Sequence, residues 1–378
     1  MKKLIVIALM TGLVAAVASF TNEPSAADSP SFNDSLRTLY ERSVAQWPQP
    51  FIEQGVQWKE LTALPVDSQL VAKLKDPKIQ LGKLLFFDPR LSGSNQISCS
   101  SCHDPDLAWT DGRTVSLGNN HLQGTRNTSS LLNVGQFKEF FWDGRAASLE
   151  DQAINPMATM HEMNQEPPTI PAELAAIPGY PPLFEKVFGD KRINLDRILQ
   201  AIAAFERSIS SRRSRFDDFV NGKYKQLSDE EIQGLHLFRT KARCMNCHNG
   251  TYFTDNQFHN IGLTYYGRKY EDLGRYKVTK EAADVGKFRT PSLRDVMRTR
   301  PWMHNGLFDN IDGILNMYNA GMPQPKPKPD QVNDPLFPKT DPLIKKLELT
   351  PEEKKSIIAF LDAITGVPYK MDRPELPQ

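Results

Sequence analysis

The sequence predicts a mainly α-helical protein with two domains, long loops and little β structure. An apolar stripe of residues spaced three or four apart predicts a helix over residues 195–209. Ser228 with Glu231, and Thr350 with Glu353, form capping boxes that predict the starts of two more helices. Alternation of apolar and polar residues, the pattern of a strand, is scarce.

The composition is that of an ordinary globular protein. The chain has 378 residues, of which 39% are hydrophobic and 24% charged, which is enough for two domains with separate cores. Its net charge of +1 gives no basic field that would attract nucleic acid. We therefore expect no nucleic-acid partner.

The N-terminus has the pattern of a secretory signal. Lys2 and Lys3 precede an apolar run, which ends in small residues with Ala16 and Ala18 in an A-x-A arrangement. A membrane anchor is the alternative, but the apolar run is shorter than the roughly 20 residues of a spanning helix. We expect a cleaved signal peptide over residues 1–20, a periplasmic location and no membrane span in the mature protein.

The chain has four cysteines, and all of them belong to two C-x-x-C-H motifs. The motifs consist of Cys99, Cys102 and His103, and of Cys244, Cys247 and His248. Two thiols on one turn can form thioethers to the vinyl groups of a haem, and the following histidine can bind its iron. A redox pair, a zinc site and local disulfides are alternatives, but the first two need no histidine directly after the second cysteine. The duplicated pattern predicts two covalently bound c-type haems.

The two motifs are far enough apart to lie in separate domains. The helix over residues 195–209 would close the first of them. We expect an N-terminal haem domain over residues 21–215 and a C-terminal haem domain over residues 216–378. The proline-rich segments 167–182 and 323–342 are expected to be loops.

Four longer segments share the pattern of one enzyme family. They read LGKLLFFDPRLSGSNQISCSSCH, LLNVGQFKEFFWDGRAASLEDQA, ARCMNCHNGTYFTDNQFHNIGL and KFRTPSLRDVMRTRPWMHNG. They resemble the bacterial di-haem cytochrome c peroxidase and MauG family. The resemblance implies two cytochrome c-like domains, with a haem that reacts with hydrogen peroxide in the first and an electron-relay haem in the second. It also implies a redox partner protein, a calcium ion near the domain interface and, in some members, a homodimer.

The resemblance implies roles for two further residues. Glu162 in HEMNQ takes the place of the family's acid/base carboxylate, which moves a proton between the peroxide oxygens. The residues MATMH before it are extra relative to the family pattern, and a solvated surface glutamate is the alternative. Trp142 in FWDGR matches the tryptophan that carries a hole between the haems, with a core tryptophan as the alternative.

The resemblance also bears on the distal side of the first haem. Many family peroxidases carry there a histidine that must leave the iron before peroxide binds. That position resembles Asn119 in this chain, although His121 lies two residues away. We expect the first haem to be five-coordinate.

The calcium ligands follow from the resemblance alone. Asn127 in RNT, and Thr290 and Pro291 in RTPSL, match the segments that supply them in relatives. Side-chain and carbonyl oxygens of this kind suit calcium.

The sixth ligand of the second haem is expected in ILNMYNAGM. Tyr318 aligns with the position that is methionine in ordinary family peroxidases and tyrosine in MauG-like members. Met317, one residue away, and Met303 are the rivals, and either methionine could instead be core packing. A thioether favours ferrous iron, whereas a phenolate favours ferric and higher states.

These residues predict a peroxidase-family oxidoreductase. It would reduce hydrogen peroxide at the first haem with electrons relayed through the second, in MauG-like fashion with oxidation of a partner protein. An ordinary cytochrome c peroxidase, with a Met-ligated second haem fed by a small cytochrome or cupredoxin, is the first alternative. A non-catalytic di-haem electron carrier is the alternative from another class.

Overall fold

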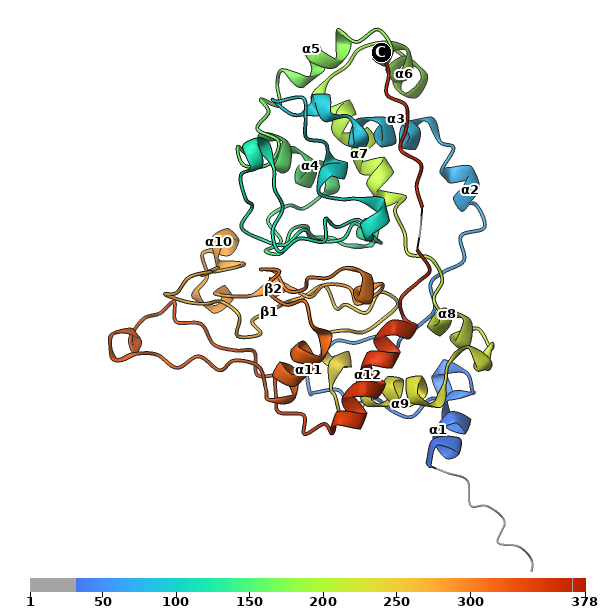
Figure 1. The fold of residues 1–378 in the computed structure, drawn as a ribbon, viewed down its shortest axis with the longest axis vertical. Coiled ribbons are helices and arrows are strands. Elements are labelled where there is room, and N and C mark those ends of the chain that lie inside the picture. Colours follow the sequence, from blue (N-terminus) through green and yellow to red (C-terminus); the bar gives the residue numbers. More distant parts are fainter. Residues whose placement is uncertain (1–31, 369) are drawn as a thin grey trace, which may run out of the picture.

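The computed structural model describes residues 32–368 and 370–378, and the signal peptide predicted for residues 1–20 lies outside them. The helices are α1 (Phe32–Tyr40), α2 (Leu70–Lys73), α3 (Pro77–Phe87), α4 (Leu149–Ala158), α5 (Ile170–Ala175), α6 (Tyr180–Phe188), α7 (Leu195–Arg207), α8 (Arg215–Val220), α9 (Asp229–Arg239), α10 (Tyr276–Thr279), α11 (Ile311–Asn319) and α12 (Pro351–Ala363). Strands β1 (Phe258–His259) and β2 (Phe288–Arg289) pair antiparallel, with Phe258 opposite Arg289. The mainly α-helical fold is confirmed for the described residues (Figure 1). No helix in this part of the chain has the length and apolar character needed to cross a bilayer.

Two separate clusters of buried side chains form the cores. The first draws on residues 81–209, chiefly from α3, α4, α6 and α7, and occupies the upper half of Figure 1. The second draws on residues 216–364, chiefly from α8, α9 and α12, in the lower half. Cys99 packs against the first cluster and Cys244 against the second, so each core holds one C-x-x-C-H motif.

The segment 36–61 packs in the second core, although the expected division of the chain placed it in the first domain. The cause is Arg239 of α9, whose guanidinium is buried. It donates hydrogen bonds to the Tyr40 hydroxyl at 3.1 Å and to the Pro48 carbonyl at 2.6 Å. It also faces the Trp47 ring at 5.3 Å. A buried charge needs such partners, so the N-terminal segment completes the second domain.

The C-terminal segment returns to the first domain. After α12 the chain runs back along the molecule and ends beside α6 (Figure 1). The Pro377 carbonyl accepts a hydrogen bond from Arg90 at 2.9 Å. The Gln378 carbonyl accepts one from the Gly179 amide at 3.0 Å. The segment before α3 and the segment after α12 therefore both pass between the domains and tie them together.

Both domains contain the same close helix crossing, made possible by a glycine. A Cβ added to Gly82 of α3 would lie 1.9 Å from the Ala201 carbonyl oxygen and 2.9 Å from Phe205 Cβ, both on α7. A Cβ added to Gly234 of α9 would lie 1.9 Å from a carbonyl oxygen of α12 and 2.8 Å from Phe360 Cβ. The missing side chain lets α3 cross α7, and α9 cross α12, at backbone contact.

Gly82→Ala and Gly234→Ala are each expected to lower the free energy of unfolding by about 1–3 kcal/mol or more, the cost of overpacking a core. Gly313→Ala in α11 is the matched control, because its added methyl would meet only Asn310 at an ordinary 3.9 Å. Denaturant unfolding of the three variants measures the difference. Equal stability of Gly82→Ala and Gly313→Ala would show that the crossing tolerates a side chain.

Candidate functional site: two haem-attachment motifs and the cavity between the domains

The first motif positions a neutral imidazole. Cys99 begins a 3-10 turn (Cys99–Ser101), and His103 follows it. The His103 Nδ1–H donates to the Trp109 carbonyl at 3.0 Å, and left-handed backbone at Ala108 and Trp109 forms the turn that brings this carbonyl to the ring. Burial lowers the pKa of His103. Its Nε2 therefore carries a lone pair that an iron can bind.

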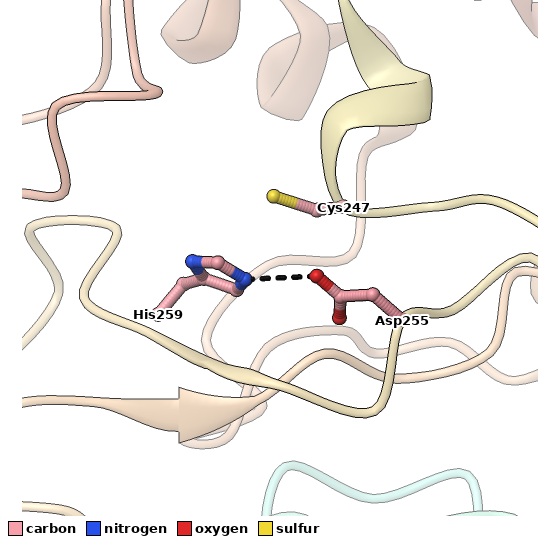
Figure 2. Close-up of side chains that lie close together, drawn as sticks. All are labelled: Cys247, Asp255 and His259. Carbon is pink, nitrogen blue, oxygen red and sulfur yellow. Dashed lines mark hydrogen bonds and ion pairs between the residues drawn. The ribbon is translucent and has the colours of Figure 1, made fainter. Parts of the chain in front are cut away.

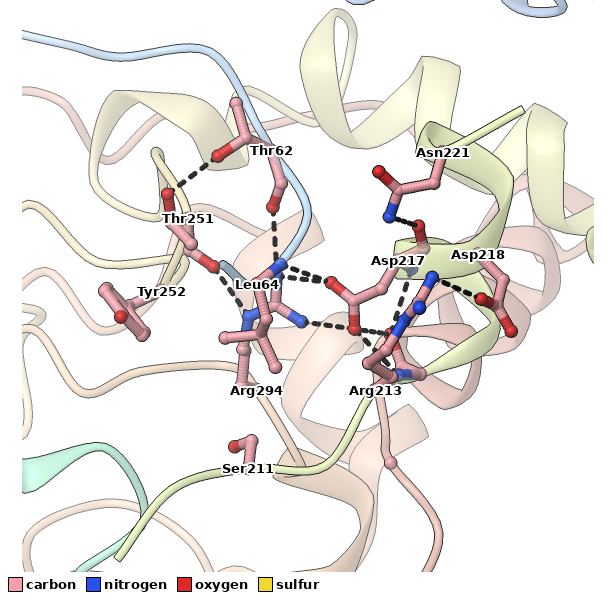
Figure 3. A network of polar contacts seen from close by, with 12 residues as sticks. Thr62, Leu64, Ser211, Arg213, Asp217, Asp218, Asn221, Thr251, Tyr252 and Arg294 are labelled. Carbon is pink, nitrogen blue, oxygen red and sulfur yellow. Dashed lines mark hydrogen bonds and ion pairs between the residues drawn. The ribbon is translucent and has the colours of Figure 1, made fainter. Parts of the chain in front are cut away.

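The second motif repeats this arrangement. The His248 Nδ1–H donates to the Phe253 carbonyl at 3.0 Å, and burial lowers the pKa of His248. Arg294 anchors the intervening loop, because its Nε donates to the Thr251 carbonyl at 2.6 Å (Figure 3). The buried Asp217 holds Arg294 in turn, through two nitrogen–oxygen contacts of 3.0 Å. This ion pair fixes the loop that orients His248.

The four cysteines form no disulfide. Burial raises the pKa of Cys102 to about 11 and that of Cys244 to about 12. Buried thiols that stay protonated are poor redox groups. The local-disulfide and redox-pair interpretations are therefore disfavoured, and the thiols suit thioether bonds to haem.

A cavity of about 270 Å³ lies beside the second motif and reaches the first domain. Cys244, Cys247 and His248 line it, together with many apolar side chains. Two cysteines, a neutral histidine and apolar walls are the groups that a covalently bound haem requires. The residues present therefore fit a c-type haem.

Tyr318, on α11, faces this cavity. Burial raises the pKa of its phenol, and the nearby Cys247 and Cys244 add to the shift. Met303 also lines the cavity, whereas Met317 is not among the lining residues. Tyr318 therefore lines the same cavity as the second motif, and Met317 does not.

Trp142 lies at the contact between the domains. Its Nε1–H donates to the Asn127 carbonyl at 2.9 Å, and its own carbonyl accepts from the Arg289 amide at 2.8 Å. The His304 ring meets the indole edge on, with centroids 6.4 Å apart, and stacks on Phe288 at 3.6 Å. All five residues line the cavity, so both domains hold the indole in place.

The three predicted calcium ligands also line the cavity. The Thr290 carbonyl already accepts a hydrogen bond from the Thr254 hydroxyl at 2.7 Å, and the Asn127 side-chain amide donates to the Arg113 carbonyl at 2.9 Å. Calcium takes roughly six to eight oxygen ligands, and of these two contacts only the one at the Thr290 carbonyl uses an oxygen of the predicted set. Calcium binding by Asn127, Thr290 and Pro291 stays a prediction.

Cys247, Asp255 and His259 form a cluster whose ligand atoms lie within 4.8 Å of one another (Figure 2). His259 Nε2 lies 3.0 Å from Asp255 Oδ2, and Nδ1 lies 2.7 Å from Asp341 Oδ2. Burial lowers the pKa of His259, but the hydrogen bonds to the two carboxylates outweigh it and raise the pKa to about 12. Cys247 belongs to the second C-x-x-C-H motif, and Cys247 and His259 both line the cavity. The cluster therefore lies at the wall of the second haem site.

Glu162 lies in the tight turn after α4. Its amide donates to the Thr159 carbonyl at 2.9 Å, and its carbonyl accepts from the Asn119 amide at 2.7 Å. Burial raises the pKa of its carboxyl, while the positive charges of His161 and a nearby arginine oppose the shift. Burial is the main cause of the raised pKa of Cys102, and the charge of Glu162 raises this pKa further. The side chain is 40% exposed, so a carboxyl that solvent can reach lies beside the first motif.

The two candidates for the first distal position lie in different surroundings. Asn119 is buried, with its amide bonded to the carbonyl of Glu162. His121 is exposed and has left-handed backbone. The structure therefore gives His121 no buried position from which to bind an iron.

Known proteins are similar in sequence to this chain over most of its length. The methylamine utilization protein MauG of Methylophilus methylotrophus is 37% identical over 305 residues, which are 80% of this chain and 86% of that protein. Cytochrome-c peroxidase IdrP1 of Pseudomonas sp. (strain SCT) is 34% identical over 330 residues, or 79% and 84% of the two chains. The chain belongs to the di-haem cytochrome c peroxidase and MauG family.

The family profile and solved structures agree with this assignment. The family described as di-haem cytochrome c peroxidase matches residues 76–225. The crystal structure of a MauG-like protein associated with microbial copper homeostasis has a TM-score of 0.70 at 31% identity, with 84% of this chain and 96% of that one covered. The di-haem peroxidase BthA from Burkholderia thailandensis E264 has a TM-score of 0.65 at 25% identity, with 85% and 94% covered.

Membership of the di-haem peroxidase and MauG family confirms three predictions. The protein is an oxidoreductase, its fold is mainly α-helical, and the resemblance found in the sequence is correct. The family implies two c-type haems, peroxide and a redox partner.

The sequence analysis assigned no role to His304, yet the structure places this residue in the wall of the cavity. The residue is 3% exposed, and burial lowers the pKa of its imidazole to about 3. Its Nε2 has no hydrogen-bond partner among the described residues. No local pattern predicts this, because the contact with Trp142 joins distant parts of the chain.

Proposed function

We propose that the protein reduces hydrogen peroxide at the haem of the first motif and oxidises a partner protein through the haem of the second, as a MauG-like member of its family. Bound haem supplies an iron that reacts with peroxide and stores its oxidising equivalents. The observation that supports this most is the position of Tyr318, which lines the cavity with His248 while Met317 does not. A phenolate ligand favours ferric and higher states, which suits a site that removes electrons from a partner.

Glu162 is the proposed acid/base residue. Its carboxylate would take a proton from one peroxide oxygen and return it to the other, which leaves as water. The position beside Cys102 and the partial exposure of the side chain support this role. The backbone hydrogen bonds to Thr159 and Asn119 would hold the carboxyl in place.

Trp142→Phe is expected to slow electron transfer between the haems without loss of either haem. Phenylalanine keeps a ring against His304 but is harder to oxidise and lacks the hydrogen bond to Asn127. Stopped-flow mixing of peroxide with protein in which only the second haem is reduced measures the rate. Trp47→Phe, a change in the second core away from the cavity, is the control. Equal rates in the native and Trp142→Phe proteins would remove Trp142 from the path.

An ordinary cytochrome c peroxidase with a methionine-ligated second haem is the second candidate. The presence of Met303 in the cavity wall favours it, because a thioether raises the potential of a haem that accepts electrons. A non-catalytic electron carrier would need a ligand on the distal side of the first haem. The exposed His121 does not favour that function.

Steady-state assays separate the two enzymatic functions. Peroxide reduction is measured with a reduced small c-type cytochrome and with a reduced cupredoxin as electron donors. The proposed function expects neither donor to support rapid turnover, whereas rapid turnover with either one indicates an ordinary peroxidase. The signal peptide predicted in residues 1–20 supports a periplasmic location for this chemistry.

A further inference from the structure

Glu206, near the end of α7, carries a buried carboxyl group beside the first haem motif. The residue is 4% exposed, and its Oε2 has no hydrogen-bond partner among the described residues. The adjacent Arg207 does not neutralise it, because that guanidinium binds Glu150 at 2.8 Å. A buried polar atom without a partner in a native protein indicates a group or a role that the protein atoms alone do not show.

The two glycine-mediated helix crossings indicate which way Glu206 faces. Phe205 packs against the glycine of α3 as Phe360 packs against the glycine of α9, so Glu206 corresponds to Leu361. Leu361 lines the cavity of the second haem motif. The thiol of Cys99 also feels the charge of Glu206. Burial raises the pKa of this thiol, and the charge of Glu206 raises it further. The first haem site therefore has a carboxyl where the second has a leucine.

We propose that Glu206 belongs to the first haem site and exchanges a proton with solvent when that haem changes oxidation state. It binds one proton as the haem gains one electron from a reduced partner protein, and it releases the proton when the electron leaves. A carboxylate in a poorly solvated interior stabilises the ferric state through its negative charge. Reduction removes the compensating positive charge, so the carboxyl then holds a proton more tightly.

The surroundings of Glu206 bring this proton exchange into the pH range in which most proteins work. Burial raises the pKa of Glu206 to about 8, while Arg207 opposes the shift and Glu150 adds to it. Arg207 lies on the same helix, Glu150 on α4, and Cys99 in the haem motif. Once Cys99 is a thioether it carries no charge, so the other two groups and the haem dominate the field at Glu206.

The test is a spectroelectrochemical titration of the haem-loaded full chain between about pH 6 and about pH 10. The midpoint potential of the native first haem is expected to fall by up to about 59 mV per pH unit, the one-electron equivalent of a tenfold change in proton activity. Glu206→Gln and Glu206→Leu should lose this dependence, and the control Glu185→Gln, at an exposed glutamate of α6, should keep it. The same dependence in the native protein and in both Glu206 variants would overturn the proposal.

Two further measurements do not require a stable Glu206 variant. Infrared difference spectra of the native protein at mildly alkaline pH should gain a protonated-carboxyl band on reduction of the first haem. The reciprocal change Leu361→Glu should make the potential of the second haem depend on pH. A native spectrum without the band would refute the proposal, as would a second-haem potential that Leu361→Glu leaves independent of pH.

Discussion

Glu162→Gln is expected to slow the reaction of the ferric protein with hydrogen peroxide by about 10²–10⁴-fold, the range for loss of a general acid/base group. Glutamine has nearly the same shape as glutamate but cannot accept the proton. The turn should survive, because backbone hydrogen bonds to Thr159 and Asn119 hold it. Stopped-flow absorbance at fixed pH measures the rate, and the resting spectra show whether both haems are intact.

The same step is expected to weaken in acid. Burial raises the pKa of Glu162 above its ordinary value, so the carboxylate is fully present above the raised pKa and is lost as the pH falls through it. The native rate should therefore drop on acidification, and Glu162→Gln should show no such step. Glu166→Gln, an exposed glutamate in the same segment, is the control and should keep the native profile. A native rate in Glu162→Gln would mean that another group moves the proton.

Tyr318→Phe is expected to remove the oxygen ligand of the second haem. The resting ferric EPR signal of that haem should change from a six-coordinate to a five-coordinate, high-spin form. Its reduction potential should rise, since axial ligands move haem potentials over a range of about 0.8 V. The first haem should keep its spectrum, because Tyr318 lies on α11 and lines the cavity together with the residues of the second motif.

The two methionines supply the comparison. Met317→Leu should leave the spectrum of the second haem unchanged, because Met317 is not among the residues that line the cavity. Met303→Leu tests the rival that does line it. If Met303→Leu alters the second haem and Tyr318→Phe does not, the ligand is a thioether and an ordinary peroxidase becomes the better assignment.

Local signals made much of the fold predictable. The capping boxes of Ser228 and Thr350 begin α9 and α12 as expected, and the apolar stripe over 195–209 forms α7, which ends at Arg207. Such features depend on residues three or four positions apart, which a sequence displays directly. The C-x-x-C-H motifs can be recognised in the sequence for the same reason, because their residues lie close together along the chain.

Features that depend on distant contacts were not predictable. The packing of segment 36–61 in the second core rests on Arg239, nearly two hundred residues further on. The place of Glu206 follows from a helix crossing that no local pattern shows. The segment 167–182, expected to be a loop, contains α5 and the start of α6. Pro171 lies in the first turn of α5, and Pro181 and Pro182 lie in the first turn of α6, where the missing N–H costs nothing.

The most direct test of the proposed function is to add one equivalent of hydrogen peroxide to the fully ferric protein without reductant. Visible, near-infrared and EPR spectra then follow both haems. We expect the peroxide to be consumed at once, with spectral changes at both haems that persist in the native protein and are lost in Tyr318→Phe. A ferric protein that stays inert until its second haem is reduced by one electron would contradict the proposal and indicate a reductively activated cytochrome c peroxidase.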